Sequence, residues 1–526
     1  MEIKNNEYDV IVVGAGIAGL IATAYLTKYH YHPLLLEQSN QIGGLVHSFT
    51  NQGFTFDTGI RAFENSGIIF PMLKQLGIKI DFVKSPACLK IGNEFVYFNS
   101  KDSLNDYQKL LEKHFPNEIN NISQIIEEIK KIMKYMEVIY GIDNPLFLDS
   151  FKDKEYVFKT LIPWLIKYQK NIKKAMKLSE PVNDFLRRFT QNQALIDIIS
   201  QHFFQNTPTF FALSYFGLYP DYSYPIGGTE VLPQKIAEFI ENNQGEIKTN
   251  SQVVRIDVDK KQVILENNEI FGYKKLIWAC DLNTLYRIIE FDKNKSLRLV
   301  IKQRKLLHQN KGGDSIFSLF LETNFDKSYF EKCSGAHCFY TPTIEGITKF
   351  GKPNNCSLKQ EKIKWVESYL KNTTYEISIP SLRDPNLAPP NKTGVIISTL
   401  MDYSFVKKIF DEGWYEEFKY LCKEIIINIL SSTIFPELED KILLYQSSTP
   451  LTIARITKNS DGAITGWAFS NNKLPSESRM PKIARSILTP IPHVFQAGQW
   501  SFSPSGVPIS ILTGKLAADK IKKQLK

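Results

Sequence analysis

The chain has 526 residues, 43% hydrophobic and 23% charged, a composition typical of a folded protein that is too long for a single core. Its net charge of +9, from 64 basic and 55 acidic residues, is small for this length. Because it has neither an arginine-rich arm nor zinc-finger spacing, we expect no nucleic-acid partner. Six cysteines without a C-x-x-C pair indicate free thiols in a reducing cytoplasm, and we expect no metal site.

The first 37 residues carry the most specific pattern in the chain. Tyr8–Val13 predicts a buried strand that runs directly into a G-x-G-x-x-G motif at 14–19. A helix is predicted over 17–26, and a second strand ends in Glu37, 18 residues after the last glycine. Such a βαβ unit is typical of dinucleotide binding, because the glycines let the backbone approach a pyrophosphate and the acid accepts hydrogen bonds from a ribose.

The apolar run Val10–Leu26 has two alternative interpretations, a membrane anchor and a secretory signal. Glycines interrupt the run, and it is shorter than the roughly 20 apolar residues that a spanning helix needs. Glu7 and Asp9 stand where a secretory signal has basic residues. We therefore expect a cytoplasmic protein, and any membrane contact would be peripheral, on the inner face of the cell membrane.

A second glycine pattern follows the acidic strand, at Gly43-Gly44 and at Asp57-Thr58-Gly59. The adjacent glycines offer another place where backbone can approach a ligand. The short strand between the two patterns differs from the plain βα repeat of nicotinamide enzymes, so it favours a longer cofactor. Near the other end of the chain, a strand and a glycine turn are predicted over 494–498, and a helix over 509–523.

Two inserted blocks are expected between these ends. The first is helical, with helices predicted over 104–115, 122–140 and 183–202. The unusually aromatic stretch 203–224 suits either an apolar ligand or a packed helical core. After a return to α/β character up to Cys280, the second block contains strands predicted over 315–321, 374–379 and 395–400.

One part of the helical block is strongly basic. Lys131–Lys177 contains ten lysines against five acidic residues, with aromatic residues interleaved. Within it, the stretch 159–170 alternates apolar stripes with lysines, as does a helix that lies on an anionic membrane surface. The alternative interpretation is a solvated amphipathic helix on an ordinary protein surface.

Together these patterns resemble the FAD-dependent family of phytoene desaturases, carotenoid isomerases and retinol saturases. Besides the glycine motifs, the resemblance rests on five ordered segments, Tyr224–Gly228, Gly245–Arg255, Pro380–Pro390, Thr449–Trp467 and Ala497–Ile509. Two positions depart from the family pattern. Asn391 replaces a glycine, and Leu45 stands where bacterial phytoene desaturases usually have arginine, which brings the chain closer to the isomerase and saturase branch.

The resemblance implies an α/β fold. Its core would be a Rossmann-like FAD-binding domain of the glutathione reductase and amine oxidase type, with an inserted α+β substrate domain. We expect a discontinuous FAD-binding domain over 1–85, 225–285 and 445–526. A substrate-binding, membrane-facing domain would then occupy 86–224 and 286–444.

The resemblance also implies where FAD lies. The first glycines would hold its pyrophosphate, Glu37 its adenosine ribose, the backbone of Val254 its adenine, and the C-terminal loop the far end of the flavin. The implied cofactor-binding residues are Gly14, Ala15, Gly16, Ala18, Gly19, Glu37, Gln38, Gly44, Leu45, Val46, Thr58, Gly59, Val254, Gly498, Gly506, Val507 and Pro508.

His47 and Arg61 are the catalytic candidates and Glu64 is a weaker one, while the flavin N5 would be the redox centre. The leading hypothesis is an oxidoreductase that desaturates, saturates or isomerises carbon–carbon bonds of an apolar polyene or isoprenoid lipid taken from a membrane surface. NAD(P)H or a quinone is the candidate electron partner. The alternatives are an amine-oxidase-like flavoprotein and a flavin-free protein that binds prenyl lipids, as the Rab GDP-dissociation inhibitors do. The sequence leaves the oligomeric state open.

Overall fold

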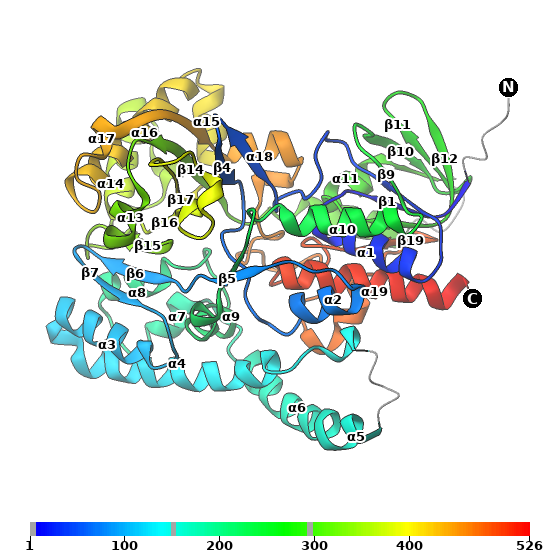
Figure 1. The fold of residues 1–526 in the computed structure, drawn as a ribbon, viewed down its shortest axis with the longest axis horizontal. Coiled ribbons are helices and arrows are strands. Elements are labelled where there is room, and N and C mark those ends of the chain that lie inside the picture. The colour runs from blue at the N-terminus through cyan, green and yellow to red at the C-terminus, as the bar shows by residue number, and fades with distance from the viewer. Residues whose placement is uncertain (1–6, 149–153, 292–297, 526) are drawn as a thin grey trace.

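Two β-sheets organise the fold, and helices cover both (Figure 1). The computed structural model describes residues 7–148, 154–291 and 298–525. Residues 149–153 of the basic segment Lys131–Lys177 therefore lie outside the described residues. So do short parts of both predicted domains. The first sheet is on the right of Figure 1, and the second sheet is at the upper left.

The first sheet is built around β1 (Glu7–Val13), which pairs in parallel with β2 (Pro33–Leu36) and β12 (Ile270–Trp278). Its other strands are β9 (Glu246–Lys248), β10 (Val253–Asp257), β11 (Gln262–Leu265), β13 (Ile289–Glu290) and β19 (Val494–Gln496). Its helices are α1 (Ile17–Lys28), α2 (Ile69–Leu76), α10 (Val231–Asn242), α11 (Leu282–Ile288), α12 (Arg298–His308) and α19 (Val507–Leu525). Helix α1 is buried from Ile17 to Thr27 because α10 and α19 pack against it, which accounts for its mostly apolar sequence.

The second sheet is mixed and seven-stranded, in the order β18-β14-β17-β16-β15-β6-β7. The strands are β6 (Cys88–Ile91), β7 (Glu94–Tyr97), β14 (Ser315–Thr323), β15 (His337–Thr341), β16 (Tyr375–Ser378), β17 (Thr393–Met401) and β18 (Ile442–Ser448). The associated helices are α13 (Lys327–Cys333), α14 (Lys359–Asn372), α15 (Tyr403–Asp411), α16 (Tyr415–Ser432), α17 (Leu438–Lys441) and α18 (Pro450–Thr457). One face of the sheet packs on these helices to form a core, which leaves the other face for the interior of the molecule.

A helical layer lies below the second sheet in Figure 1. It contains α3 (Ser103–His114), α4 (Ile119–Tyr140), α5 (Lys154–Tyr156), α6 (Ile162–Met176), α7 (Val182–Leu186), α8 (Gln193–Ser200) and α9 (Thr209–Ser214). The prediction of one helix over 183–202 is wrong, because the segment is two helices. Asn192 begins the second helix, since its side chain accepts a hydrogen bond from Leu195 N at 3.3 Å.

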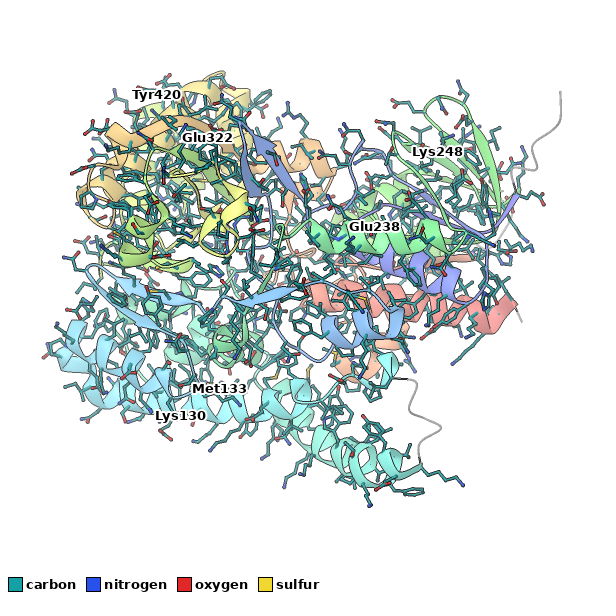
Figure 2. The ribbon with its side chains drawn as sticks, in the orientation of Figure 1. Lys130, Met133, Glu238, Lys248, Glu322 and Tyr420 are labelled. Atoms are coloured by element: carbon teal, nitrogen blue, oxygen red, sulfur yellow. The ribbon has the colours of Figure 1, made fainter. Side chains whose placement is uncertain are left out.

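Two pairs of short antiparallel strands join the units. In the first, β5 (Phe82–Lys84) pairs with β8 (Ser223–Pro225), so the segments before β6 and after the helical layer lie side by side. In the second, β3 (Ser48–Asn51) and β4 (Phe54–Asp57) reach across to the second sheet. Asn51 Nδ2 there donates to Glu322 Oε1 of β14 at 2.5 Å, and Glu322 is labelled in Figure 2.

Two predicted domain limits fall inside structural units. β13 and α12 follow residue 285, yet β13 pairs with β10 and α12 packs into the core of the first sheet. β18 crosses the limit at 444 and belongs to the second sheet. These differences arise because the predicted limits follow changes in sequence character, whereas the units are defined by strand pairing and shared cores.

Candidate functional site

The G-x-G-x-x-G loop forms a tight turn between β1 and α1. Gly14 has a φ of +98°, and its N–H donates to Leu36 O at 2.8 Å, which ties the loop to the end of β2. A β-carbon on Gly19 would lie 1.9 Å from Gly14 O, so only glycine lets helix and loop close on each other. A β-carbon on Gly16 would meet nothing within 4 Å. The backbone at Gly16, the N-cap of α1, is therefore open to a ligand, and its helix end favours an anion.

Glu37 closes the other side of this loop. Its carboxylate accepts hydrogen bonds from Ala15 N at 2.7 Å and Ser39 N at 2.9 Å. Burial raises the pKa of Glu37, and these backbone N–H groups oppose that rise. Glu37 and Gln38 line the cavity at the carboxyl end of β2, where parallel sheets bind nucleotides.

The second glycine pattern packs directly on the first. Gly43 N donates to Ala15 O at 2.8 Å, and a β-carbon on Gly44 would lie 3.2 Å from the α-carbon of Gly16. A β-carbon on Gly59 would lie 2.0 Å from Leu45 O, so the Thr58-Gly59 turn rests on the same loop. Two chain segments thus present bare backbone to one space.

The C-terminal loop completes this arrangement. Gly498 has a φ of +91°, and a β-carbon there would lie 3.2 Å from the β-carbon of Ala18. Gly498 N donates to Thr513 Oγ1 at 2.9 Å, which fastens the loop to α19. Gly506 and Val507, at the start of α19, border the same cavity. Both ends of the chain therefore build one binding site.

One continuous cavity of about 780 Å³ joins this glycine-lined end to the second sheet. Beyond Gly59 its wall becomes an aromatic chamber, formed by Phe203, Phe204, Phe211, Tyr215, Tyr219, Tyr222 and Phe339. Burial raises the pKa of the three tyrosines well above its usual value, so they stay protonated and neutral. The cavity therefore changes from a polar, backbone-lined channel to an apolar pocket of a size that takes a small ligand.

Most of the predicted cofactor residues line this cavity, and four do not. The residues that line it are Gly14, Gly16, Ala18, Glu37, Gln38, Gly44, Leu45, Val46, Thr58, Gly59, Gly498, Gly506 and Val507. Ala15 and Gly19 lie behind the loop, where they fix its shape. Val254 is exposed on β10, and its neighbour Val253 borders the cavity instead, because successive strand residues face opposite sides. Pro508 borders a second, smaller cavity.

Both predicted catalytic residues border the cavity, and hydrogen bonds hold both side chains. His47 Nδ1 lies 2.8 Å from Gly44 O and 2.9 Å from Thr58 Oγ1, so it holds the two glycine turns together. Arg61 is buried, and it donates from Nη1 to Asp57 O at 2.6 Å and from Nη2 to Ser398 Oγ at 3.1 Å. These contacts hold the two side chains in place beside the cavity, and their catalytic role stays a prediction.

The second sheet contributes polar groups that the sequence patterns did not predict. Glu376 on β16 and His337 on β15 border the cavity, with His337 Nε2 2.9 Å from Glu376 Oε1. Burial lowers the pKa of His337. The only available signal was the alternation of polar and apolar residues along these strands, which by itself does not reveal which face borders a ligand.

Glu64, the weaker catalytic candidate, borders both the main cavity and the second cavity. Burial raises the pKa of its carboxyl group. A carboxyl group that keeps its proton at higher pH beside an apolar chamber can act as a proton donor. Among the described residues, no group of histidines, cysteines and acids has the arrangement of a metal site.

The fold and the glycine-lined cavity are those of a flavoprotein that binds a dinucleotide. The profile of the flavin-containing amine oxidoreductase family matches residues 17–522, so the chain belongs to that family. The protein is an FAD-dependent oxidoreductase. Gly16, Gly44 and Gly498 fit the cofactor, because each presents backbone without a side chain to the channel.

Three curated relatives cover most of the chain. Prolycopene isomerase 2 of an Oncidium hybrid cultivar is 24% identical, over 99% of this chain and 84% of its own length. The 1-hydroxycarotenoid 3,4-desaturase of a Flavobacterium species is 23% identical, over 97% and 98%. The all-trans-retinol 13,14-reductase of Danio rerio is 24% identical, over 94% and 82%.

The solved structures agree on the fold. A variant of putrescine oxidase with redesigned cofactor binding has a TM-score of 0.62 at 13% identity, and the match covers 98% of this chain and 99% of that one. At that identity the likeness shows the fold alone. Among the described residues, no helix combines the length and apolar content that crossing a bilayer requires.

Proposed function

We propose that this protein is an FAD-dependent oxidoreductase that acts on carbon–carbon bonds of a polyene or isoprenoid lipid. One observation carries the proposal. The dinucleotide channel opens, within a single cavity, into the aromatic chamber. The names of the carotenoid isomerase, carotenoid desaturase and retinol reductase among its relatives support a polyene as the substrate.

The residues of the chamber would bind and orient the substrate. Bound FAD supplies hydride transfer at N5, and the protein positions the reacting carbons against it. Tyr215, Tyr219 and Tyr222 offer flat, neutral rings that a conjugated chain can stack on, and they exclude water. Glu64 would hold a proton at its carboxyl group beside this path.

We also propose that the protein takes its substrate from a membrane surface. Phe158, Ile162, Leu165 and Ile166 are exposed along α6 and the turn before it, and we name them the α6 patch. Lys159, Lys167 and Lys170 lie among them, which gives the helix the charge that an anionic lipid surface attracts. In Figure 1 this helix extends away from the rest of the molecule.

A second cavity supports a route from this helix to the chamber. It has a volume of about 160 Å³ and lies behind the α6 patch, against Trp164, Tyr168 and Ile172. It shares Glu64, Phe211, Tyr215, Ser505 and Gly506 with the main cavity. A lipid that entered beside α6 would therefore reach the aromatic chamber through apolar surroundings.

The activity is tested with the purified flavoprotein, chemically reduced without oxygen and mixed with all-trans-retinol or with carotenes. We expect one of these polyenes to reoxidise the flavin with formation of a more saturated product. Desaturation and isomerisation are tested with the oxidised enzyme and the same polyenes, with a quinone as acceptor. NAD(P)H as electron donor is tested by reduction of the flavin. If no polyene reacts in either form, the proposal fails.

The same preparation tests the alternatives. Hydrogen peroxide formed from amines would indicate an amine oxidase. A purified protein without flavin absorbance near 450 nm that binds prenyl lipids would indicate a lipid-binding protein instead.

A further inference from the structure

The floor of the aromatic chamber contains a carboxylate that the mechanism above does not use. Glu376 faces the cavity from β16, in register with Phe339 on β15 and Ser398 on β17. All three side chains line the cavity, and 32% of the Glu376 side chain is exposed there. A hydrocarbon that fills this space would enclose the carboxylate without a new partner.

The contacts of Glu376 and His337 determine the protonation states of the two side chains. Burial opposes ionisation of Glu376, but the His337 hydrogen bond and the charges of Arg61 and Arg383 lower its pKa overall, so it is a carboxylate at neutral pH. A carboxylate can only accept, so His337 Nε2 carries the hydrogen of that bond. Because burial lowers the pKa of His337, the ring is neutral and its Nδ1 is an acceptor.

The polar floor of the chamber consists of Glu376, His337, Arg61 and Arg383. These side chains do not satisfy all of one another's hydrogen bonds. His337 Nδ1 and Arg61 Nε are both buried without a hydrogen-bond partner among the described residues. No ion pair within 4.0 Å joins Glu376 to Arg61 or Arg383 in the described part of the chain; the arginines bind Asp57 O, Arg61 O and two serines instead. Because these two nitrogen atoms are buried, the exposed part of the Glu376 carboxylate is what a group in the cavity can meet.

The charge balance indicates which kind of group the Glu376 carboxylate would bind. The positive charges of Arg61 and Arg383 are matched by the negative charges of Asp57 and Glu376, so the floor has no net charge with which to attract a cation. An anion would be repelled by the Glu376 carboxylate, which faces the cavity. A neutral group that donates a hydrogen bond fits best.

We infer that Glu376, held by His337, binds the hydroxyl group of the substrate, so the substrate is an alcohol with a polyene or isoprenoid chain. The inference rests on the proposed function. The hydroxyl hydrogen points to the Glu376 carboxylate, and the aromatic chamber encloses the chain. A site that hydrogen-bonds a substrate hydroxyl rejects the analogue without it, because its own polar group is then left unpaired.

The test uses the oxidised flavoprotein and three probes: all-trans-retinol, its methyl ether, and the hydrocarbon in which a methyl group replaces the CH2OH group. Their dissociation constants are measured by quenching of protein fluorescence. We expect the alcohol to bind at least tenfold more tightly than either analogue. In Glu376→Gln the alcohol should lose at least fivefold in affinity, while the hydrocarbon keeps its affinity within twofold.

Thr207→Val is the matched control. Thr207 lines the same cavity, but its hydroxyl group already donates to Phe204 O at 2.6 Å, so the preference for the alcohol should remain. Retained flavin absorbance shows that each variant folds. Equal binding of the ether and the alcohol, or an unchanged preference in Glu376→Gln, overturns the inference and leaves the proposed function intact. If none of the probes binds and no polyene reacts, the proposed function fails as well.

Discussion

Gly14 and Gly19 are in contact through backbone: a β-carbon on Gly19 would lie 1.9 Å from Gly14 O, closer than any real contact. A β-carbon on Gly16, between them, would meet nothing within 4 Å. The three glycines of one motif therefore have different tasks. Gly14 and Gly19 close the fold, and Gly16 leaves room for the cofactor.

This difference predicts opposite results for two alanine variants. Gly19→Ala should destabilise the flavin-free protein by about 1–3 kcal/mol, because backbone must move to admit the methyl group. Gly16→Ala should leave the stability of the flavin-free protein unchanged within about 0.5 kcal/mol, the range of surface substitutions. It should nevertheless weaken FAD binding at least tenfold. Urea unfolding without FAD and titration with FAD measure the two effects, and equal destabilisation by both variants would contradict the assignment.

Glu37 gives a second prediction about the cofactor. Its two carboxylate oxygens bind Ala15 N and Ser39 N, and glutamine can replace only one of them as an acceptor. Glu37→Gln should therefore weaken FAD binding by about tenfold, or ~1.4 kcal/mol.

The control for this variant is Glu246→Gln on the neighbouring strand β9. Glu246 binds Tyr8 OH at 2.8 Å on the exposed side of the sheet, outside the residues that line the cavity. Its FAD affinity should match that of the wild type. A loss of affinity in both variants would indicate a general effect of charge.

The sequence was sufficient to predict the glycine loops, since bare backbone near a ligand requires glycine at fixed spacing. It also predicted β1, β14 and β17 to within a few residues, because apolar runs between turn residues are a local signal. It did not predict β6, β7, β15 or β18 of the second sheet. Val254 shows the limit of such reasoning. The strand was predicted, but which of its residues border the cavity depends on how β10 pairs with β11 and with β13, and β13 follows only after β12 and α11.

The polar floor of the chamber was beyond prediction for the same reason. Glu376, His337 and Arg61 come from three distant segments, and nothing near any one of them in sequence indicates the others. Strand pairing between β15 and β16 brings the first two together, and Ser398 on β17 holds the third. Nonlocal pairing thus creates chemistry that local patterns do not carry.

Asp314 makes the stability of the protein depend on pH. Burial raises its pKa to about 6, from the ordinary value of 3.8, although the hydrogen bond from Gln205 N opposes the rise. The folded state therefore holds this proton more tightly than the unfolded state. The stabilisation is fully present below pH 4 and is lost as the pH rises through 6.

Asp314→Asn removes this titration and retains an oxygen that can accept the bond from Gln205 N. The free energy of unfolding of the wild type, relative to this variant, should fall between pH 4 and pH 7. Urea unfolding at several pH values measures it. Parallel curves for the two proteins would show that Asp314 does not titrate in this range.

The α6 patch predicts binding to anionic lipid. Phe158 is 67% exposed and Ile166 is 69% exposed, and burying a side chain of this size in lipid contributes about 1.5–3 kcal/mol. The protein should therefore sediment with vesicles of phosphatidylglycerol and phosphatidylcholine, and less with phosphatidylcholine alone, because the lysines add attraction to the anionic lipid. Replacing both residues by serine should reduce the bound fraction at least tenfold.

The matched control replaces Leu299 and Ile301 of α12 by serine. These residues are 62% and 56% exposed on another basic helix, which does not line the second cavity. Loss of vesicle binding in the α12 variant, with binding retained in the α6 variant, would place the membrane contact on α12 and separate it from the route to the aromatic chamber.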